Sequence, residues 1–259
     1  MRDPGLTEAI RTAGGVSELA RRLGIAQPSV SNWSRVPAER VLAVEAATGI
    51  TRARLRPDLF ARQGEAMDDV DGARARHYEL LSALLSRSPG AELLARLARM
   101  QVDASPLGLA LAALAEAACD TGAEAAEREY FDLFIGLGRG ELMPYGSYYL
   151  TGFLNERPLA RLRADLAELG IARSAAKAEP EDHIALLCEV MAGLIDRRFP
   201  AEAGTDRRIF ECHLKPWVGR FFADLERAEG ARFYRPVGTL GRVFIDIETE
   251  AFALLELTA

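Results

Sequence analysis

Cysteine and histidine are scarce in this chain of 259 residues, which has only three of each. An odd number of widely spaced cysteines, with no C-x-x-C pair, does not fit a disulfide framework and favours a reducing compartment. No H-E-x-x-H motif occurs, and no histidine stands beside paired cysteines, so no metal site is expected. The residues concerned are Cys119, Cys188 and Cys212, and His77, His183 and His213.

Long apolar runs are absent as well. No segment approaches the roughly 18 to 20 uninterrupted apolar residues of a membrane helix, and the N-terminus lacks a charged region followed by an apolar run. The G-x-S-x-G, P-loop and dinucleotide-binding signatures are missing, and the glycine-rich residues 136–140 lack the flanking strand and helix that such a site needs. We therefore expect a cytoplasmic protein that is not an enzyme and carries no cofactor.

Runs of β-branched residues are scarce, whereas Ala, Leu, Arg and Glu dominate and apolar residues recur at three-to-four spacing. This pattern predicts an all-α fold. The helices expected in the first sixty residues are 6–12, 16–23, 27–34 and 38–48. Those expected after residue 72 are 73–86, 91–100, 106–119, 123–134, 148–153, 159–169, 181–199, 205–213, 216–228 and 231–255.

Composition divides the chain into three parts. Residues 1–60 form a small head, residues 61–72 are a polar linker that cannot bury enough apolar surface to pack well, and residues 73–259 form the body. The head has nine arginines against six acidic residues, while the whole chain has a net charge of −6. A mildly basic head could contact phosphates, and an acidic body could attract an arginine-bearing peptide.

Residues 19–33 have the pattern of a helix-turn-helix. Such a motif needs a small residue where the helices cross, a glycine at the turn and apolar residues that pack back from the second helix. These positions are filled in turn by Ala20, Gly24, Val30 and Trp33.

Residues 6–60 resemble the Cro/YdaS group of bacterial DNA-binding proteins. The resemblance implies that the start of the second helix enters the major groove. The candidate base or phosphate contacts are Gln27, Ser29, Ser31 and Asn32, and the candidate phosphate contacts are Arg21, Arg22 and Arg35. A single head reads one half-site, so DNA binding would call for a homodimer. The alternative is a structural or protein-binding helix pair without affinity for DNA.

A short signature, Glu179-Pro180-Glu181-Asp182-His183, precedes the apolar helix that begins at Ile184. Proline can start a helix, and acidic residues are favourable in its first turn, so helix capping alone could explain the acids. Apolar residues along one side of the helix should anchor it to the core, which would leave the acid-and-histidine cluster at an exposed or half-exposed start. His183 is either a structural hydrogen-bonding residue or part of a ligand surface.

A second stretch lies upstream. It contains the helix Tyr130-Phe131-Asp132-Leu133-Phe134 and the loop Pro144-Tyr145-Gly146-Ser147-Tyr148-Tyr149. In order and spacing, the two stretches resemble the aromatic-x-x-Leu-Phe helix, the P-x-x-S-x-Y loop and the E-P-x-D-H motif of TorD/DmsD-like (NarJ-related) redox-enzyme maturation chaperones. The resemblance spans residues 77–255, although Gly146 replaces the acidic residue that usually precedes the loop serine.

The resemblance implies a chaperone that binds the twin-arginine signal peptide, or the apoprotein, of a molybdenum-cofactor oxidoreductase and delays its export. A receptor for such a peptide needs carboxylates beside an apolar groove. The implied peptide-binding residues are Glu179, Pro180, Glu181, Asp182 and His183, with Phe134, Tyr145, Ser147, Tyr148 and Tyr149. Ordinary core packing is the alternative for the aromatic residues, and is expected for Phe131 and Phe134.

A second function remains open. The chain could be a one-component transcriptional regulator whose helical body senses a small molecule or a peptide. A small-molecule pocket would be enclosed and mostly apolar, whereas a peptide groove would be open with acidic residues at its rim. Exposure of Glu179, Asp182 and Tyr148 is expected to separate the two readings.

Overall fold

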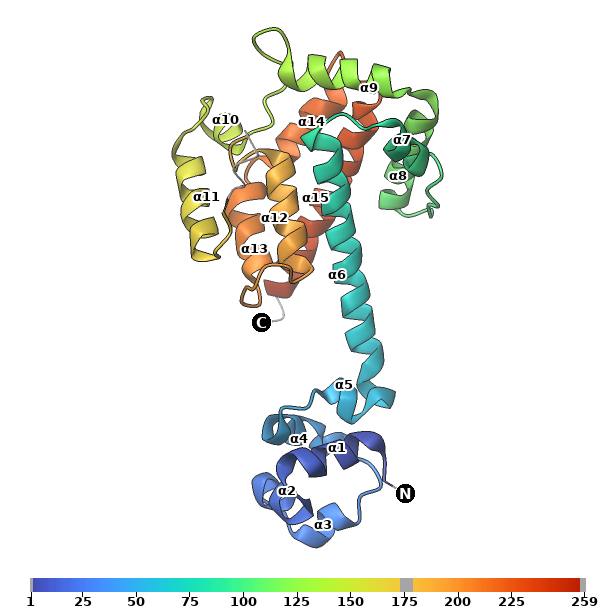
Figure 1. The fold of residues 1–259 in the computed structure, drawn as a ribbon, viewed down its shortest axis with the longest axis vertical. Helices are drawn as coiled ribbons and strands as arrows, with labels where there is room; N and C mark the ends of the chain where they lie inside the picture. The colour runs from blue at the N-terminus through green and yellow to red at the C-terminus, as the bar shows by residue number, and fades with distance from the viewer. Residues whose placement is uncertain (1, 173–178, 257–259) are drawn as a thin grey trace. The chain divides into compact units, whose positions relative to one another are not determined.

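The structure, a computed structural model, describes residues 2–172 and 179–256, with side chains placed throughout except at positions 53, 60–69 and 255–256. In these ranges every regular element is a helix (Figure 1), and the single extended pairing is an isolated antiparallel bridge between Tyr145 and His183. The predicted all-α class is confirmed. The chain divides into two compact units, residues 1–71 (unit 1) and residues 72–259 (unit 2).

Unit 1 is built from short helices. They are α1 (Pro4–Ala13), α2 (Val16–Leu23), α3 (Gln27–Ser31), the 3-10 turn η1 (Ala38–Arg40), α4 (Val41–Thr48) and α5 (Arg52–Leu55). The second helix of the motif is predicted to reach residue 34 but ends at Ser31. The Trp33 N–H donates to the Val30 carbonyl, three residues back, at 3.2 Å, and so leaves the α-helical pattern of bonds four residues back. The predicted helix 38–48 likewise begins as a 3-10 turn.

The helix-turn-helix has its own small core. Gly24 ends α2 with φ of 64°, a left-handed conformation that favours glycine, and so lets the chain turn into α3. Leu19, Ala20 and Val30 are buried at the helix crossing. Trp33 is half-buried and packs against this core, so the residues predicted for these positions do the packing expected of them.

Helix α6 (Pro57–Ser86) runs through residues 61–72. The polar linker predicted at residues 61–72 therefore lies within a helix, and the division between the two units falls at Asp71 and Gly72. The segment has no proline and contains Ala, Arg, Gln, Glu and Met, which favour a helix, although its two glycines and three aspartates lower its helix propensity.

Unit 2 contains the remaining helices. They are α7 (Ala91–Leu97), α8 (Pro106–Asp120), α9 (Ala123–Tyr130), η2 (Phe131–Ile135), α10 (Gly146–Thr151), α11 (Arg157–Glu168), α12 (Ile184–Ile195), α13 (Thr205–Ile209), η3 (Phe210–Leu214), α14 (Val218–Arg227) and α15 (Tyr234–Glu256). Helix α12 is shorter than the predicted 181–199, because His183 caps its start and Arg197 takes a left-handed φ of 57° just past its end. Among the described residues, no helix has the length and apolar character needed to cross a membrane.

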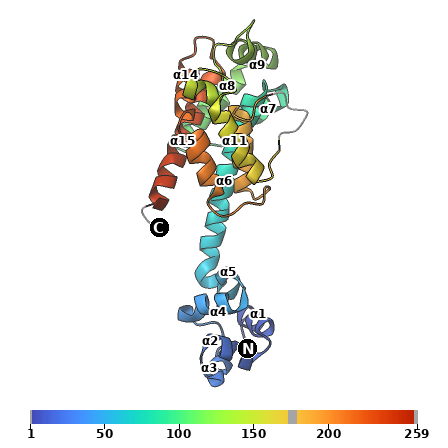
Figure 2. The same cartoon turned by 90° about the vertical axis from the view of Figure 1, so that its left-hand side faces the viewer.

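The core of unit 2 lies between α12, α14, α15 and the second half of α6. Helices α14 and α15 pack side by side (Figures 1 and 2), and Phe221, Phe222 and Phe244 are buried between them and their neighbours. Nearly all of α12 faces this core, including the predicted apolar stripe from Ile184 to Leu194. The helix is thus held along its length, and its first residues are fixed in position.

Two π-helical turns interrupt regular helix in unit 2. Segment η2 carries the predicted aromatic-x-x-Leu-Phe pattern, and its wider turn rotates the faces that follow it. Leu133 is fully buried and Phe134 packs against the core, but Phe131 is 38% exposed, so the prediction of core packing for Phe131 is wrong.

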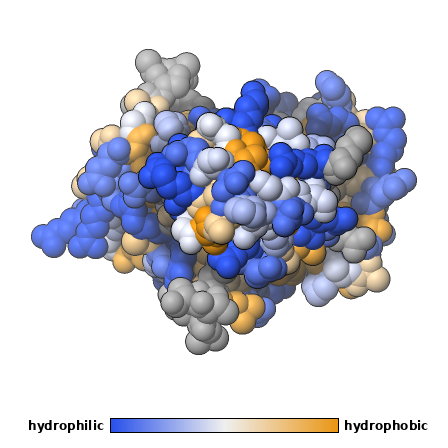
Figure 3. All heavy atoms as spheres, turned by 90° about the horizontal axis from the view of Figure 1, so that it is seen from below, coloured by the Kyte–Doolittle hydropathy of each residue, from blue (hydrophilic) through white to orange (hydrophobic). Residues whose placement is uncertain are grey.

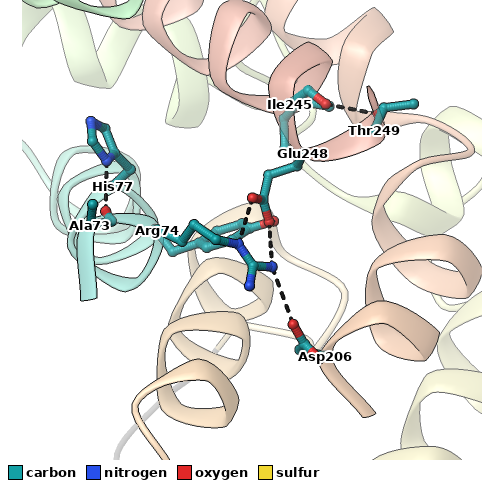
Figure 4. Close-up of polar contacts among 8 residues, drawn as sticks. Ala73, Arg74, His77, Asp206, Ile245, Glu248 and Thr249 are labelled. Carbon is teal, nitrogen blue, oxygen red and sulfur yellow. Dashed lines mark hydrogen bonds and ion pairs between the residues drawn. The ribbon is translucent and has the colours of Figure 1, made fainter. Parts of the chain in front are cut away.

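A buried ion pair ties the first helix of unit 2 to its last (Figure 4). The Arg74 guanidinium donates from Nε to Glu248 at 2.7 Å and from Nη2 to Asp206 at 3.1 Å. The Tyr78 hydroxyl also donates to Glu248, at 3.1 Å, and burial beside this carboxylate raises the pKa of Tyr78 well above its usual value. Because Glu248 is 1% exposed, loss of Arg74 would leave a buried, unpaired charge.

Candidate functional site

The two signature stretches meet through their backbones. The Gly146 N–H donates to the Asp182 carbonyl at 3.0 Å, and the Ile184 N–H donates to the Pro144 carbonyl at 2.9 Å. Together with the bridge between Tyr145 and His183, these bonds align the P-x-x-S-x-Y loop antiparallel to the E-P-x-D-H segment. The two motifs therefore form one structural feature at the start of α12.

Asp182 is buried inside this feature. Its Oδ2 accepts a hydrogen bond from the Ser147 N–H at 2.7 Å, and the two residues are 3% and 0% exposed. The expectation of an exposed acid at this position is corrected: the carboxylate holds the first turn of α10 and cannot reach solvent. Asp182 Oδ1 and Ser147 Oγ are buried without a hydrogen-bond partner among the described residues.

His183 is also buried, at 5% exposure, and has the structural role that the sequence left open. Its Nδ1 accepts from the Ala185 N–H at 3.1 Å, which caps α12, and its ring meets the Tyr145 ring edge-on with centroids 5.1 Å apart. Burial lowers the pKa of His183 to about 4, although Glu179 and Asp182 oppose the shift. The imidazole is therefore neutral at physiological pH, as its acceptor role requires.

The two glutamates of the signature lie outside the core. Glu179 is exposed, and its carboxylate accepts a hydrogen bond from the Tyr145 hydroxyl. Burial, followed by this bond, raises the pKa of Tyr145. Glu181 forms an ion pair with Arg163 of α11 at 2.8 Å. The signature thus points Asp182 and His183 inward, keeps Glu179 at the surface and leaves Glu181 half-buried in its ion pair.

Gly146 replaces an acidic residue of the related motif for a visible reason. A Cβ atom at this position would lie 3.0 Å from Nε1 of Trp217, a side chain that is itself 1% exposed. Glycine lets α10 pack directly on the indole, whose N–H donates to the His213 carbonyl at 2.7 Å.

The remaining predicted aromatic residues take part in packing rather than in an open groove. Phe134 meets the Tyr234 ring edge-on, and the Tyr149 hydroxyl donates to Asp224 at 3.0 Å. Tyr148 is half-buried, and its hydroxyl accepts from Arg139, whose guanidinium lies over the ring.

A cleft of about 890 Å³, which we call the first cleft, opens beside the signature. Glu179 and His183 line it from the motif, and Glu189 and Leu186 line it from α12. The opposite wall comes from the end of α6, the turn after it and α7, and its residues are Ser82, Ala83, Ser86, Arg87, Ser88, Pro89, Gly90, Glu92, Leu93 and Arg96. Phe134, Tyr145, Ser147, Tyr148 and Tyr149 are not among the lining residues, and Tyr145 is linked to the cleft through its hydrogen bond to Glu179.

Sequence reasoning missed the far wall of this cleft. Its residues lie about 90 positions before the motif, in a Ser-Pro-Gly turn and an ordinary amphipathic helix, and no local pattern links them to Glu179. The wall adds Glu92 to the exposed carboxylates of Glu179 and Glu189, so that three carboxylates line the cleft together with the two exposed arginines of the wall, Arg87 and Arg96, and Leu93 and Leu186 supply apolar lining. Carboxylates beside apolar side chains in an open cleft are the features that an arginine-bearing peptide needs.

In unit 1, the polar residues predicted to contact DNA lie on an accessible surface. Gln27, Ser29 and Asn32 are exposed and Ser31 is half-buried. The face that carries α3 is turned to the viewer in Figure 3 and is mostly hydrophilic. Gln27 already donates to the Ser31 hydroxyl at 3.2 Å, so base contacts by either residue would have to replace this bond.

The arginines predicted to contact phosphates all have carboxylate partners within unit 1. Arg21 binds Glu18 through two nitrogens, and this hydrogen bonding lowers the pKa of Glu18 to about 2. Arg22 also lies 3.4 Å from Glu18, and Arg35 lies 3.4 Å from Asp58. Residues 1–71 hold ten arginines against ten acidic residues, so unit 1 has no net positive charge to attract DNA.

No group of three or more His, Cys, Asp or Glu side chains in residues 2–172 and 179–256 has the geometry to hold a metal ion. Cys119 and Cys212 are exposed, and Cys188 is buried in α12, where burial raises its pKa.

Two family models match different parts of the chain. The model described as nitrate reductase delta subunit matches residues 101–223, which include both signature stretches. The model described as bacterial toxin YdaS matches residues 6–63. The two matches agree with the resemblances seen in the sequence and fall on separate parts of the chain.

Curated relatives of the chain are TorD chaperones, as the match in the body leads us to expect. The TorD chaperone proteins of Vibrio atlanticus and Aliivibrio fischeri are 26% and 28% identical to this chain over 135 residues, which cover 48% of this chain. The chain spans 63% of the length of these two curated relatives. A crystal structure described as a redox enzyme maturation protein from Archaeoglobus fulgidus covers 67% of this chain and 93% of its own, with 20% identity and a TM-score of 0.44. The chain is thus similar to the YdaS family in residues 6–63 and to the nitrate reductase delta subunit family and the TorD chaperones in its body.

Proposed function

We propose that the chain is a maturation chaperone that binds the twin-arginine signal peptide, or the apoprotein, of a molybdenum-cofactor oxidoreductase in the cytoplasm before export. The observation that carries this proposal is the first cleft, into which the E-P-x-D-H signature places Glu179 beside Glu189 and Leu186. Guanidinium groups pair strongly with carboxylates, and the apolar wall suits the side chains that follow the arginines.

The action is binding and not catalysis. The relatives carry the name of a chaperone, and the charged residues of the first cleft suit ion pairing at its open surface. Net charge supports a cationic client, because residues 72–259 hold 22 basic against 28 acidic residues.

The proposal is tested by calorimetric titration of the full-length chain with a twin-arginine signal peptide from a molybdoenzyme of the same organism. We expect saturable binding that weakens when both peptide arginines are replaced by lysines, because lysine cannot form the bidentate pair with a carboxylate that arginine forms. Glu179→Gln should weaken binding, whereas Glu124→Gln, which removes an exposed charge from α9 outside the cleft, should not. Absence of saturable binding to the unmodified peptide would refute the proposal.

For unit 1 we propose DNA binding through the start of α3, by Gln27, Ser29, Ser31 and Asn32, within a homodimer. The support is the match to the YdaS model and the exposure of these polar side chains. Because the arginines are paired, the affinity should be low at physiological salt and should depend on base contacts more than on charge. DNA fragments selected from a random pool test the proposal, when their binding to the wild type is compared with their binding to a Gln27→Ala and Asn32→Ala double variant.

The rival function, a transcriptional regulator that senses a small molecule, predicts an enclosed apolar pocket in the body. The first cleft instead has exposed charged residues on both walls, which favours a peptide. If a small metabolite released bound DNA and the protein bound no signal peptide, the regulator would be favoured.

A further inference from the structure

A second cleft lies on the other side of α12. It measures about 400 Å³ and is lined mainly by apolar residues of α11, of α12 and of the segments that follow each of them. The apolar lining consists of Leu166, Gly170, Ile171, Ala172, Leu186, Val190 and Phe199. Its charged residues are both acidic: Glu181, which is paired with Arg163, and Glu189.

The two clefts share one wall. Leu186 and Glu189 line both of them, and residues three apart lie next to each other on one face of a helix. Leu186 is half-buried and Glu189 is exposed, so this pair forms a low ridge of α12 between the clefts. A bound chain that leaves the first cleft over this ridge enters the second.

The clefts differ in chemistry. The first has three exposed carboxylates, two exposed arginines and several serine hydroxyls along its walls, whereas the second has a mainly apolar lining and no basic side chain among its lining residues. A cavity of about 150 Å³ lined by apolar side chains suffices for benzene, so the second cleft has room for two large apolar side chains. An arginine-bearing segment thus fits the first cleft, and an apolar segment fits the second.

We propose that the two clefts form one peptide groove with a fixed direction, in which the arginines of the client occupy the first cleft and the following apolar residues occupy the second. This inference rests on the function proposed above and specifies the shape of the ligand that the site takes. A helix is about 10 Å wide and an extended chain advances about 3.3 Å per residue. The ridge therefore separates the last arginine from the first apolar anchor by about three residues.

Cross-linking tests the direction. Signal peptides with a photoreactive benzoylphenylalanine either before the arginines or in the apolar segment are bound to the full-length chain, illuminated and mapped by mass spectrometry. The probe before the arginines should label the end of α6 or α7, near Ser86 and Leu93. The probe in the apolar segment should label Ile171 or Phe199. A reversed pattern, or both probes on the α6–α7 wall, would overturn the groove.

A matched pair of variants tests the second cleft. Ala172 is exposed and lines it, and Ala167 is equally exposed on α11 outside both clefts. Ala172→Asp should weaken binding of the full signal peptide by about tenfold, because it places a charge among apolar groups. It should leave binding of a peptide truncated after the arginines unchanged, and Ala167→Asp should affect neither peptide.

The outcomes separate this inference from the proposed function. If the unmodified peptide does not bind, both fail. If it binds and Ala172→Asp weakens the full and the truncated peptide equally, or weakens neither, the second cleft is not part of the site while the chaperone function stands. Loss that is confined to the full peptide, together with the expected labels, supports the directed groove.

Discussion

Glu179 and Asp182 are carboxylates of the same short signature, yet they have opposite environments. Asp182 is buried and binds the backbone of the neighbouring loop, while Glu179 is exposed at the rim of a cleft. A carboxylate that accepts a buried backbone hydrogen bond contributes to stability, whereas an exposed one contributes little to stability and is accessible to a ligand. Residues of one motif can therefore have separate tasks, one in building the site and the other in recognition.

Tyr145 connects the two halves. Its ring packs against the buried His183, and its hydroxyl binds the exposed Glu179. If this division is correct, substitutions in the buried half should change the free energy of unfolding. Substitutions in the exposed half should change peptide affinity. The two effects should be separable in the full-length chain.

The largest effect is expected from the protonation of His183. Its pKa is about 4 in the folded protein and 6.5 without the fold, so below pH 6.5 the unfolded chain binds a proton that the folded chain does not. The contribution of His183 to the free energy of unfolding is fully present above pH 6.5. It decreases as the pH falls from 6.5 towards 4, by at most about 1.4 kcal/mol per pH unit, and the total loss at pH 4 is about 3 kcal/mol.

Urea unfolding of the wild type and of His183→Gln, repeated between pH 7 and pH 4, measures this contribution as the difference between the two proteins. The difference removes the background from other acids, such as Glu18 in unit 1. Parallel pH curves for the two proteins would contradict a buried, neutral histidine.

Loss of the Asp182 carboxylate should have the next largest effect. Asp182→Ala leaves the buried Ser147 N–H without its acceptor and should lower the free energy of unfolding by about 2 kcal/mol. Asp182→Asn keeps an oxygen acceptor and should lose less. Because the chain has only two tryptophans, a Trp33→Phe background leaves Trp217 as the fluorescent reporter of unit 2. The exposed Asp132→Ala is the control, and an equal change in both variants would argue against the buried role.

In the exposed half, Glu179→Gln should affect recognition alone. We expect signal-peptide affinity to fall about threefold to tenfold, with the free energy of unfolding within about 0.5 kcal/mol of the wild type. The loss should shrink at high salt, because an exposed ion pair is screened. Calorimetry at two salt concentrations measures it, and a variant that unfolds early without losing affinity would reverse the assignment.

The smallest effect is expected from Tyr145→Phe. This change keeps the ring that packs on His183 and removes only the hydroxyl bonded to Glu179. Stability should change by less than about 1 kcal/mol, and peptide affinity by about twofold, because Glu179 loses its positioning contact. An affinity loss larger than that of Glu179→Gln would show that Tyr145 contacts the peptide itself.

Local pattern was sufficient to predict most of the helices and the core face of α12. Apolar spacing places Ile184, Leu187 and Met191 on one side of a helix, and all three are buried. Gly24 and Val30 likewise identify the turn and the packing of the helix-turn-helix. Such predictions succeed because the information lies within a few turns of the residue concerned.

The burial of Asp182 and the location of the cleft could not be predicted in this way. Asp182 is buried because its carboxylate bonds to a loop 35 residues earlier in the chain, and the far wall of the first cleft comes from α6 and α7. The acids and the proline of the signature are equally consistent with an exposed helix cap and with a buried hydrogen bond at Asp182. The packing of Phe134 and Tyr149 could not be predicted for the same reason, because their partners Tyr234 and Asp224 lie far along the sequence.

The pair formed by Arg74 and Glu248 joins residues 174 positions apart. During synthesis on the ribosome, residues 1–71 have all their own core partners once α5 and the start of α6 have been made. Unit 2, in contrast, cannot form the pair between Arg74 and Glu248 until its last long helix has been translated, because a contact between distant residues requires both of them. Unit 1 is therefore free to fold while unit 2 is still incomplete, and the nascent chain acquires its two parts at different times.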